Sequence, residues 1–393
     1  DHLNAYARAL HTTLDASGFT PYEIIGNLVQ LKNAGAPVPD YRLPKAIGWT
    51  REAFKSRKAL LAKLGKHVEK IGLPEEHVWR GVGLKAVLPQ DVVRIRDQAD
   101  VALRAVSAWR NSLASLAERL RVTATSFEEA EALTRMAKHL TAAPAMDRSS
   151  LTHPAWRTRR QSISELLESG KRFTEARERL ANTFVPEAWD ADLREVRRTL
   201  NTYGRSWWRI FRADYRRART TLKSYLTGAP PKQMDEQLAI LDELRNGQES
   251  RAAIRDKDAL GRAAFGTLWN LENSSWKDLE AIADWQARTA EEDLPWDIFA
   301  VGAEIEGETG LESRVRELEQ ATVSAWQAFR NLAEALQLDA RASFNVDTLN
   351  RVSVDALVER LRCWSEDPPD IQEWITYSLW CAEARDLDLA PII

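Results

Sequence analysis

The residues best suited to chemistry in this sequence are basic and aromatic side chains between residues 194 and 223. That window holds ten Arg or Lys residues and only two acidic residues, Glu195 and Asp214, so it carries a net charge of +8. The whole chain carries −3, which leaves −11 for the remaining residues. A row of guanidinium groups can contact phosphates and position a nucleic-acid strand without reading its sequence. The segregated charge therefore makes this window a candidate nucleic-acid interface.

A helix over residues 205–227 would bring these side chains onto one surface. At about 100° per residue, six basic residues fall within about 80° of arc, beside a stripe of aromatic and aliphatic residues. The basic residues are Arg205, Arg209, Arg212, Arg216, Arg219 and Lys223, and the second stripe holds Trp208, Phe211, Tyr215, Leu222 and Leu226. We take the six basic residues, Trp208 and Tyr215 as the candidate nucleic-acid-binding residues.

Two interpretations of this helix remain open. Few acidic residues stand three or four positions from the arginines, where helical ion pairs usually form, and this leaves the guanidinium groups available for phosphates. Alternatively, the aromatic stripe packs in the core, the arginine stems cover its edge, and their charged ends pair with the acidic remainder of the chain.

The sequence contains no recognisable catalytic, metal or cofactor site. A phosphate-binding loop needs glycines before a Lys and a Ser or Thr, and neither "GKHV" at Gly65 nor "GKRF" at Gly170 fits that pattern. Asp235 and Glu236 superficially resemble the magnesium-binding acid pair of a helicase, but two prolines precede them, so we expect the start of a surface helix. The histidines and cysteines lack metal-ligand spacing. We expect this chain itself to be neither an enzyme nor a cofactor-binding protein.

The composition is that of a soluble globular protein. The chain has 393 residues, of which 44% are hydrophobic and 29% charged, which is enough to bury a core. No apolar run approaches the roughly 20 residues of a membrane-spanning helix, and the first residues do not resemble a secretory signal. Cys363 and Cys381 fall in helical sequence, which suits a reducing compartment. These features predict a cytoplasmic protein with no membrane partner.

Helix signals dominate the chain, and no alternating strand pattern of any length interrupts them. Capping boxes begin at Thr20, Ser126 and Asp370, each with a Glu three residues later. The 15 tryptophans are scattered singly except for Trp207 and Trp208, which is typical of packing anchors between helices. The sequence predicts an all-α fold, an elongated helical bundle with long heptad helices and little or no sheet.

Two stretches carry the apolar heptad spacing that is typical of coiled-coil-like helices. The first runs through Val92, Ile95, Ala99, Ala102, Val106, Trp109, Leu113, Leu116 and Leu120, and the second through Leu311, Val315, Leu318, Thr322, Ala325, Phe329, Leu332 and Leu336. Helices within a compact bundle show the same spacing over shorter runs, and this alternative stays open.

An outgoing and a returning heptad helix would divide the chain into five segments. We expect a helical base segment at 1–90, an outgoing heptad helix at 91–121, a distal helical lobe at 122–310, a returning heptad helix at 311–338 and a second base segment at 339–393. The two base segments should lie together, and the basic and aromatic helix 205–227 should lie inside the lobe.

Several stretches, taken in order, resemble one family region. They are "LNAYARALH" (3–11), "GFTPYEIIGNLVQL" (18–31), "VPDYRLP" (38–44), "HVWRGVGL" (77–84), "LTHPAW" (151–156), "FVPEAWDADL" (184–193), "YGRSWWRIFRADYRRARTTL" (203–222) and "SSWKDLEAIADW" (274–285). Together they resemble the long helical insertion inside large bacterial superfamily-one DNA/RNA helicases, which often end in a nuclease domain of the very-short-patch-repair type. The resemblance covers nearly the whole chain.

The resemblance implies a non-catalytic accessory region of an ATP-dependent helicase or helicase-nuclease, one that contacts nucleic acid or positions the remaining helicase domains. It implies that the ATP and Mg sites lie in other parts of the parent protein, and the start at Asp1 without Met suits a segment of a longer chain. The alternative is a structural coiled-coil arm for protein interaction or self-association. An unpaired basic stripe on the surface would favour the first function, and an exposed apolar stripe would favour the second.

Overall fold

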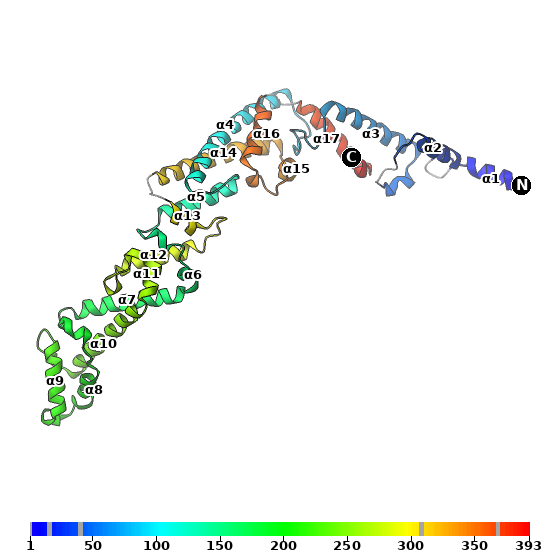
Figure 1. The fold of residues 1–393 in the computed structure, drawn as a ribbon. Coiled ribbons are helices and arrows are strands. Elements are labelled where there is room, and N and C mark those ends of the chain that lie inside the picture. The colour runs from blue at the N-terminus through cyan, green and yellow to red at the C-terminus, as the bar shows by residue number, and fades with distance from the viewer. Residues whose placement is uncertain (1, 14–17, 38–41, 306–309, 367–369) are drawn as a thin grey trace. The chain divides into compact units, whose positions relative to one another are not determined.

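The chain is all-α, as the sequence predicts. The computed structural model describes residues 2–13, 18–37, 42–305, 310–366 and 370–393, and Figure 1 shows the order of the helices. Within these residues the extended pairing consists of two isolated antiparallel bridges, Val82 with Leu338 and Phe184 with Leu226. The predicted segments 1–90, 122–310 and 339–393 and the quoted stretch 38–44 each include some residues outside the described ranges.

The chain forms two compact units. Unit 1 comprises residues 1–114, 124–130 and 317–393, and unit 2 comprises residues 115–123 and 131–316. Unit 2 thus covers nearly the same residues as the predicted distal lobe, while unit 1 combines the two predicted base segments.

Unit 1 is built from helices of both ends of the chain. Its α-helices are α1 (His2–His11), α2 (Pro21–Asn33), α3 (Arg51–Ile71), most of α4 (Pro89–Arg119), the first residues of α5 (Phe127–Thr141), most of α14 (Leu311–Leu336), α15 (Ala340–Phe344), α16 (Val354–Glu366) and α17 (Ile371–Asp386). Its 3-10 helices are η2 (Pro44–Gly48), η8 (Leu349–Arg351) and η9 (Ala390–Ile392).

The N-terminal and C-terminal segments of unit 1 pack against each other. Leu60 and Leu64 of α3 join Cys381 of α17 in one buried cluster. Further along, the indoles of Trp79 and Trp364 stack with their ring centroids 5.4 Å apart. Each of these contacts buries apolar surface between residues more than 250 positions apart in the sequence, so the two ends of the chain share one core.

The two predicted heptad helices form with nearly the predicted bounds, as α4 and α14. Their heptad residues are buried except for Val92, which is exposed, and Thr322, which is partly buried. Phe127 of α5 stacks on Trp109 of α4 at 4.0 Å and meets Trp326 of α14 edge-on at 5.1 Å. At this level both helices pack against α5, and their direct pairing as a coiled coil remains a prediction.

Unit 2 is a succession of shorter helices. Besides the last residues of α4, most of α5 and the first residues of α14, its α-helices are α6 (Ala155–Thr158), α7 (Arg160–Leu180), α8 (Arg194–Tyr203), α9 (Ala213–Tyr225), α10 (Met234–Asp256), α11 (Asp258–Phe265), α12 (Trp276–Thr289) and α13 (Ile298–Glu304). Its 3-10 helices are η3 (Arg148–Ser150), η4 (Pro186–Asp190), η5 (Trp207–Phe211), η6 (Gly266–Leu268) and η7 (Leu271–Asn273).

One buried cluster of unit 2 holds α8 and α9 together. Leu200 of α8 and Leu222 of α9 are both fully buried, and they meet Leu241 of α10 and Leu180 at the end of α7 in this cluster. Helices α8 and α9 therefore lie side by side, and α8 also packs against α10, which pairs with α7 (Figure 1).

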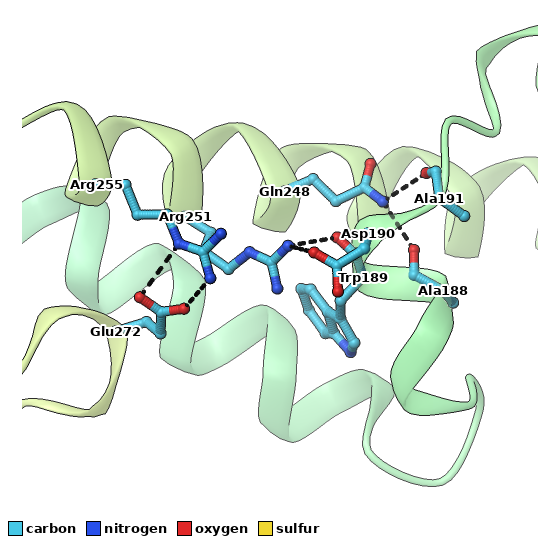
Figure 2. Close-up of polar contacts among 8 residues, drawn as sticks. All are labelled: Ala188, Trp189, Asp190, Ala191, Gln248, Arg251, Arg255 and Glu272. Atoms are coloured by element: carbon cyan, nitrogen blue, oxygen red, sulfur yellow. Dashed lines mark hydrogen bonds and ion pairs between the residues drawn. The ribbon is translucent and has the colours of Figure 1, made fainter.

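Side chains of α10 fix the segment that leads into α8 (Figure 2). Gln248 donates hydrogen bonds to the backbone carbonyls of Ala188 and Ala191, at 2.8 and 2.9 Å. Arg251 donates to the carbonyl of Trp189 at 2.9 Å. Because buried carbonyls need such partners, these bonds hold η4, and with it the start of α8, in a defined place on α10.

Candidate nucleic-acid interface

The predicted single helix over residues 205–227 is wrong. Helix α8 ends at Tyr203 with Gly204 as its C-terminal cap, and the chain becomes α-helical again only at Ala213, the first residue of α9. Between them, Ser206 and Arg212 are extended and flank the 3-10 helix η5. A Cβ atom on Gly204 would lie 2.4 Å from the carbonyl oxygen of Leu200. Glycine fits the cap there, and the chain turns into the link 204–212 that connects α8 to α9.

The break divides the six candidate cations into two groups. Arg216, Arg219 and Lys223 lie on α9, where their spacing of three and four residues keeps them on one face. Arg205, Arg209 and Arg212 lie in the link, so the angular argument for a single helix does not apply to them.

The three link arginines have partners within the protein. Arg205 forms an ion pair with Asp235 at the start of α10, with 2.6 Å between Nη2 and Oδ1, and this carboxylate raises the pKa of the guanidinium. Arg209 donates a hydrogen bond to the backbone carbonyl of Gly204. Arg212 lies over the ring of Tyr203, 4.7 Å from its centroid. Of these contacts only the first neutralises a charge.

The three α9 cations have no such partners. Arg216, Arg219 and Lys223 are exposed, and their side chains form no hydrogen bond or ion pair with any residue that the structure describes. Their neighbour Arg217 takes the only carboxylate of α9, Asp214, at 3.4 Å. These three positive charges therefore face solvent without a counter-charge.

The predicted aromatic stripe is also divided. Tyr215, Leu222 and Leu226 are buried in the cluster that joins α8 to α9, so the ring of Tyr215 has no free face for a ligand. Trp208 and Phe211 lie instead in the link and are 54% and 68% exposed. The buried face of α9 and the pair between Arg205 and Asp235 agree with the packing interpretation, while the exposed cations of α9 leave the nucleic-acid interpretation open.

Two further exposed residues of the link, Trp207 and Ile210, are not among the candidate residues that the sequence predicted. Trp207 and Ile210 are 73% and 57% exposed, and with Trp208 and Phe211 they make up what we call the exposed apolar cluster. The rings of Trp207 and Trp208 contact each other, with centroids 3.9 Å apart. The adjacent tryptophans were visible in the sequence, but nothing in their spacing predicted their exposure, because consecutive residues such as Trp374 and Ile375 are both buried elsewhere in the chain.

A pocket of about 420 Å³ lies against the exposed apolar cluster. Its lining residues are Tyr203, Ser206, Trp208, Arg209, Phe211 and Arg212. Rings and guanidinium groups thus converge on one concave surface, and no carboxylate is among the lining residues.

The part of the chain that the structure describes can also be compared with the features of a metal site and of a membrane-spanning helix. There, no group of three or more His, Cys, Asp or Glu side chains is arranged to hold a metal ion. No described helix combines the length and the apolar character needed to cross a membrane.

Comparisons with family models, with curated proteins and with solved structures find no match to this chain.

Proposed function

We propose that this chain is a non-catalytic helical accessory region of an ATP-dependent superfamily-one DNA/RNA helicase or helicase-nuclease, and that it contacts nucleic acid through α9 and the link 204–212. The observation that carries the nucleic-acid contact is the row of Arg216, Arg219 and Lys223, exposed and without a counter-charge among the described residues. The helicase parent rests on the ordered family resemblance alone, and ATP and Mg would bind elsewhere in that parent.

The row suits contacts to phosphates. Arg216 and Lys223 are separated by about 10 Å along the helix axis at about 1.5 Å per residue. Phosphates follow one another every ~3.4 Å along one strand of a DNA duplex, so the three cations span several of them. Such contacts fix the position of a strand and carry no base sequence.

The proposal predicts a specific salt dependence. In the double variant Arg216→Ala/Arg219→Ala, affinity for a nucleic-acid strand should fall uniformly across sequences. The slope of log affinity against log salt concentration should flatten by about one unit for each lost phosphate contact. Fluorescence anisotropy with labelled strands over a range of salt concentrations measures both quantities.

The matched control removes two arginines that already have partners. Arg194 and Arg198 on α8 are exposed and pair with Asp192 and Glu195, so Arg194→Ala/Arg198→Ala removes the same charge from the lobe. Its salt slope should stay close to that of the parent chain. An α9 variant that keeps both the affinity and the slope of the unmodified chain would exclude the proposed contact.

A second candidate function, protein interaction or self-association, is favoured by a different surface. No residue of α1 or α2 is buried, and together these helices expose seven large apolar side chains: Leu3, Tyr6, Tyr22, Ile25, Leu28, Val29 and Leu31. Exposed apolar surface of this kind is typical of protein contacts.

If the surface mediates self-association, Leu28→Lys should abolish a concentration-dependent increase in sedimentation coefficient. Val323→Lys, at an isolated exposed valine of α14, should not; a chain that sediments as a monomer at every concentration excludes self-association.

A further inference from the structure

The exposed apolar cluster has no role within the fold. Trp207, Trp208, Ile210 and Phe211 are all more than half exposed, whereas Phe173, Phe184 and Phe265 of the same unit are at most 4% exposed. Leaving a large apolar side chain in water forgoes the favourable free energy of burying it. Four such side chains on one short link therefore indicate a surface that something covers.

The cluster is held in a defined arrangement. The backbone of η5 closes two turns, with Arg209 N–H donating to the carbonyl of Ser206 at 3.1 Å and Arg212 N–H donating to the carbonyl of Arg209 at 3.2 Å. The side chain of Arg209 also donates to the carbonyl of Gly204. Trp208 contacts Trp207 and, at 5.9 Å between centroids, Phe211. The rings are therefore presented together on an ordered turn.

We infer that the exposed apolar cluster stacks on unpaired bases of a single-stranded nucleic acid, an inference that rests on the proposed nucleic-acid contact of α9. The occupant must be both apolar on a flat face and negatively charged, because the pocket beside the cluster combines three aromatic side chains with the guanidinium groups of Arg209 and Arg212. Every nucleobase offers such a face next to a phosphate, and Arg also stacks on bases.

Other occupants fit the same surface less well. A second copy of the chain would bring one basic link against another, and like charges brought together are costly. An anionic membrane attracts cations, but its amphipathic ligands are long helices that lie in the interface, and η5 has only 5 residues. In a duplex the bases are already stacked on one another, so reaching them requires unfavourable unstacking. An unpaired strand is the occupant that the charges and rings favour.

The test distinguishes the contribution of the bases to binding from the contribution of the phosphates. Three probes are compared at the same salt concentration: an oligothymidine strand of about 20 nucleotides, longer than the roughly 4–16 nucleotides that one binding module covers, an abasic strand of the same length, and a blunt duplex. The unmodified chain should bind the oligothymidine more tightly than either of the others, because only this probe offers phosphates and unpaired bases together.

The variant Trp207→Ala/Trp208→Ala should lose the contribution of the bases. Its affinity for oligothymidine should fall by about fivefold to a hundredfold for each lost stack, while its affinity for the abasic strand and its salt slope stay unchanged. Trp208→Phe should keep most of the affinity, because a smaller ring still stacks. The matched control is Leu73→Ala/Leu379→Ala, which removes two exposed apolar side chains of unit 1 and should leave all three affinities unchanged.

Each other outcome overturns a defined part of the argument. If the unmodified chain binds the oligothymidine and abasic strands equally, or if the tryptophan variant binds oligothymidine normally, stacking is excluded, while the α9 contact stands as long as its salt slope responds to Arg216→Ala/Arg219→Ala. If no strand binds, the proposed function fails and the stacking with it. Tryptophan-dependent sedimentation with vesicles of phosphatidylcholine and phosphatidylserine, or tryptophan-dependent self-association, would assign the cluster to a membrane or to a second copy and would overturn the inference.

Discussion

Arg194, Arg197 and Arg198 of α8 each pair with a carboxylate, whereas Arg216, Arg219 and Lys223 of α9 have no partner among the described residues. The two helices are neighbours in the chain and pack against the same core. Their apolar faces therefore both pack in this core, and the two helices differ in whether the cations on their charged faces are paired.

The difference comes from where the acidic side chains lie. Helix α8 has Asp192 just before it and Glu195 in its first turn, and Asp242 of α10 reaches it from the neighbouring helix. Helix α9 contains one acid, Asp214, and Arg217 already occupies it. On α10, Asp235 pairs with Arg205 of the link. Each arginine of α8 thus has a counter-charge, while Arg216, Arg219 and Lys223 of α9 have none among the residues that the structure describes.

The largest effect that we expect is on stability: replacing a buried leucine of either helix by alanine should lower the free energy of unfolding by a similar amount. Leu200 of α8 and Leu222 of α9 are both fully buried in the shared cluster. Leu200→Ala and Leu222→Ala should each lower the free energy of unfolding of unit 2 by about 2–5 kcal/mol through lost burial and the cavity left behind. Urea unfolding followed by far-ultraviolet circular dichroism measures these losses. A clearly smaller loss for either leucine would show that its helix does not depend on the common core.

Local periodicity and capping were enough to predict much of the fold. The heptad residues of α4 and α14 repeat at the helical spacing and are nearly all buried, and Thr20 caps α2 in the predicted box with Glu23. These signals act within a few turns of one helix, so a sequence displays them directly. Val92 is exposed although it continues the pattern, because the pattern alone does not tell where the packing neighbours of a helix end.

The candidate site was predicted only in outline. Composition located the window, but the helix break at Gly204 changed which side chains share a surface, and it separated Trp208 from Tyr215. The pairing of Arg205 with Asp235 joins residues 30 positions apart. Such a contact depends on how α8, α9 and α10 pack, which propensity and local spacing do not specify. For the cations of α9 the sequence predicted only a shared face, because their spacing is confined to one helix, and it left open whether they are paired.

The smallest effect that we expect is a pH-dependent one at the paired helix. Arg197 of α8 and Asp242 of α10 form a two-point contact, with 2.8 Å between Nη2 and Oδ2, and each side chain is 34% exposed. The hydrogen bonds from Arg197 hold the pKa of Asp242 below its ordinary value, against the opposing effect of partial burial. Solvent screening limits such a pair, so Asp242→Asn should lower the free energy of unfolding by about 0.2–1 kcal/mol at neutral pH.

The sign of its pH dependence follows from the lowered pKa. Because the carboxyl group of Asp242 binds its proton more weakly in the folded protein than in the unfolded chain, its stabilising contribution is present above the ordinary aspartate pKa of about 3.9 and is lost as the pH falls through the folded value. The difference in unfolding free energy between the unmodified chain and Asp242→Asn should therefore be constant from about pH 7 to pH 5 and shrink below about pH 4, because Asn does not titrate. The difference caused by Leu222→Ala, which removes no charge, should not follow this curve. Urea unfolding of the three proteins at each pH measures these differences. If the difference in unfolding free energy caused by Asp242→Asn is as large at about pH 3.5 as at pH 7, the charge of Asp242 does not stabilise the contact between α8 and α10.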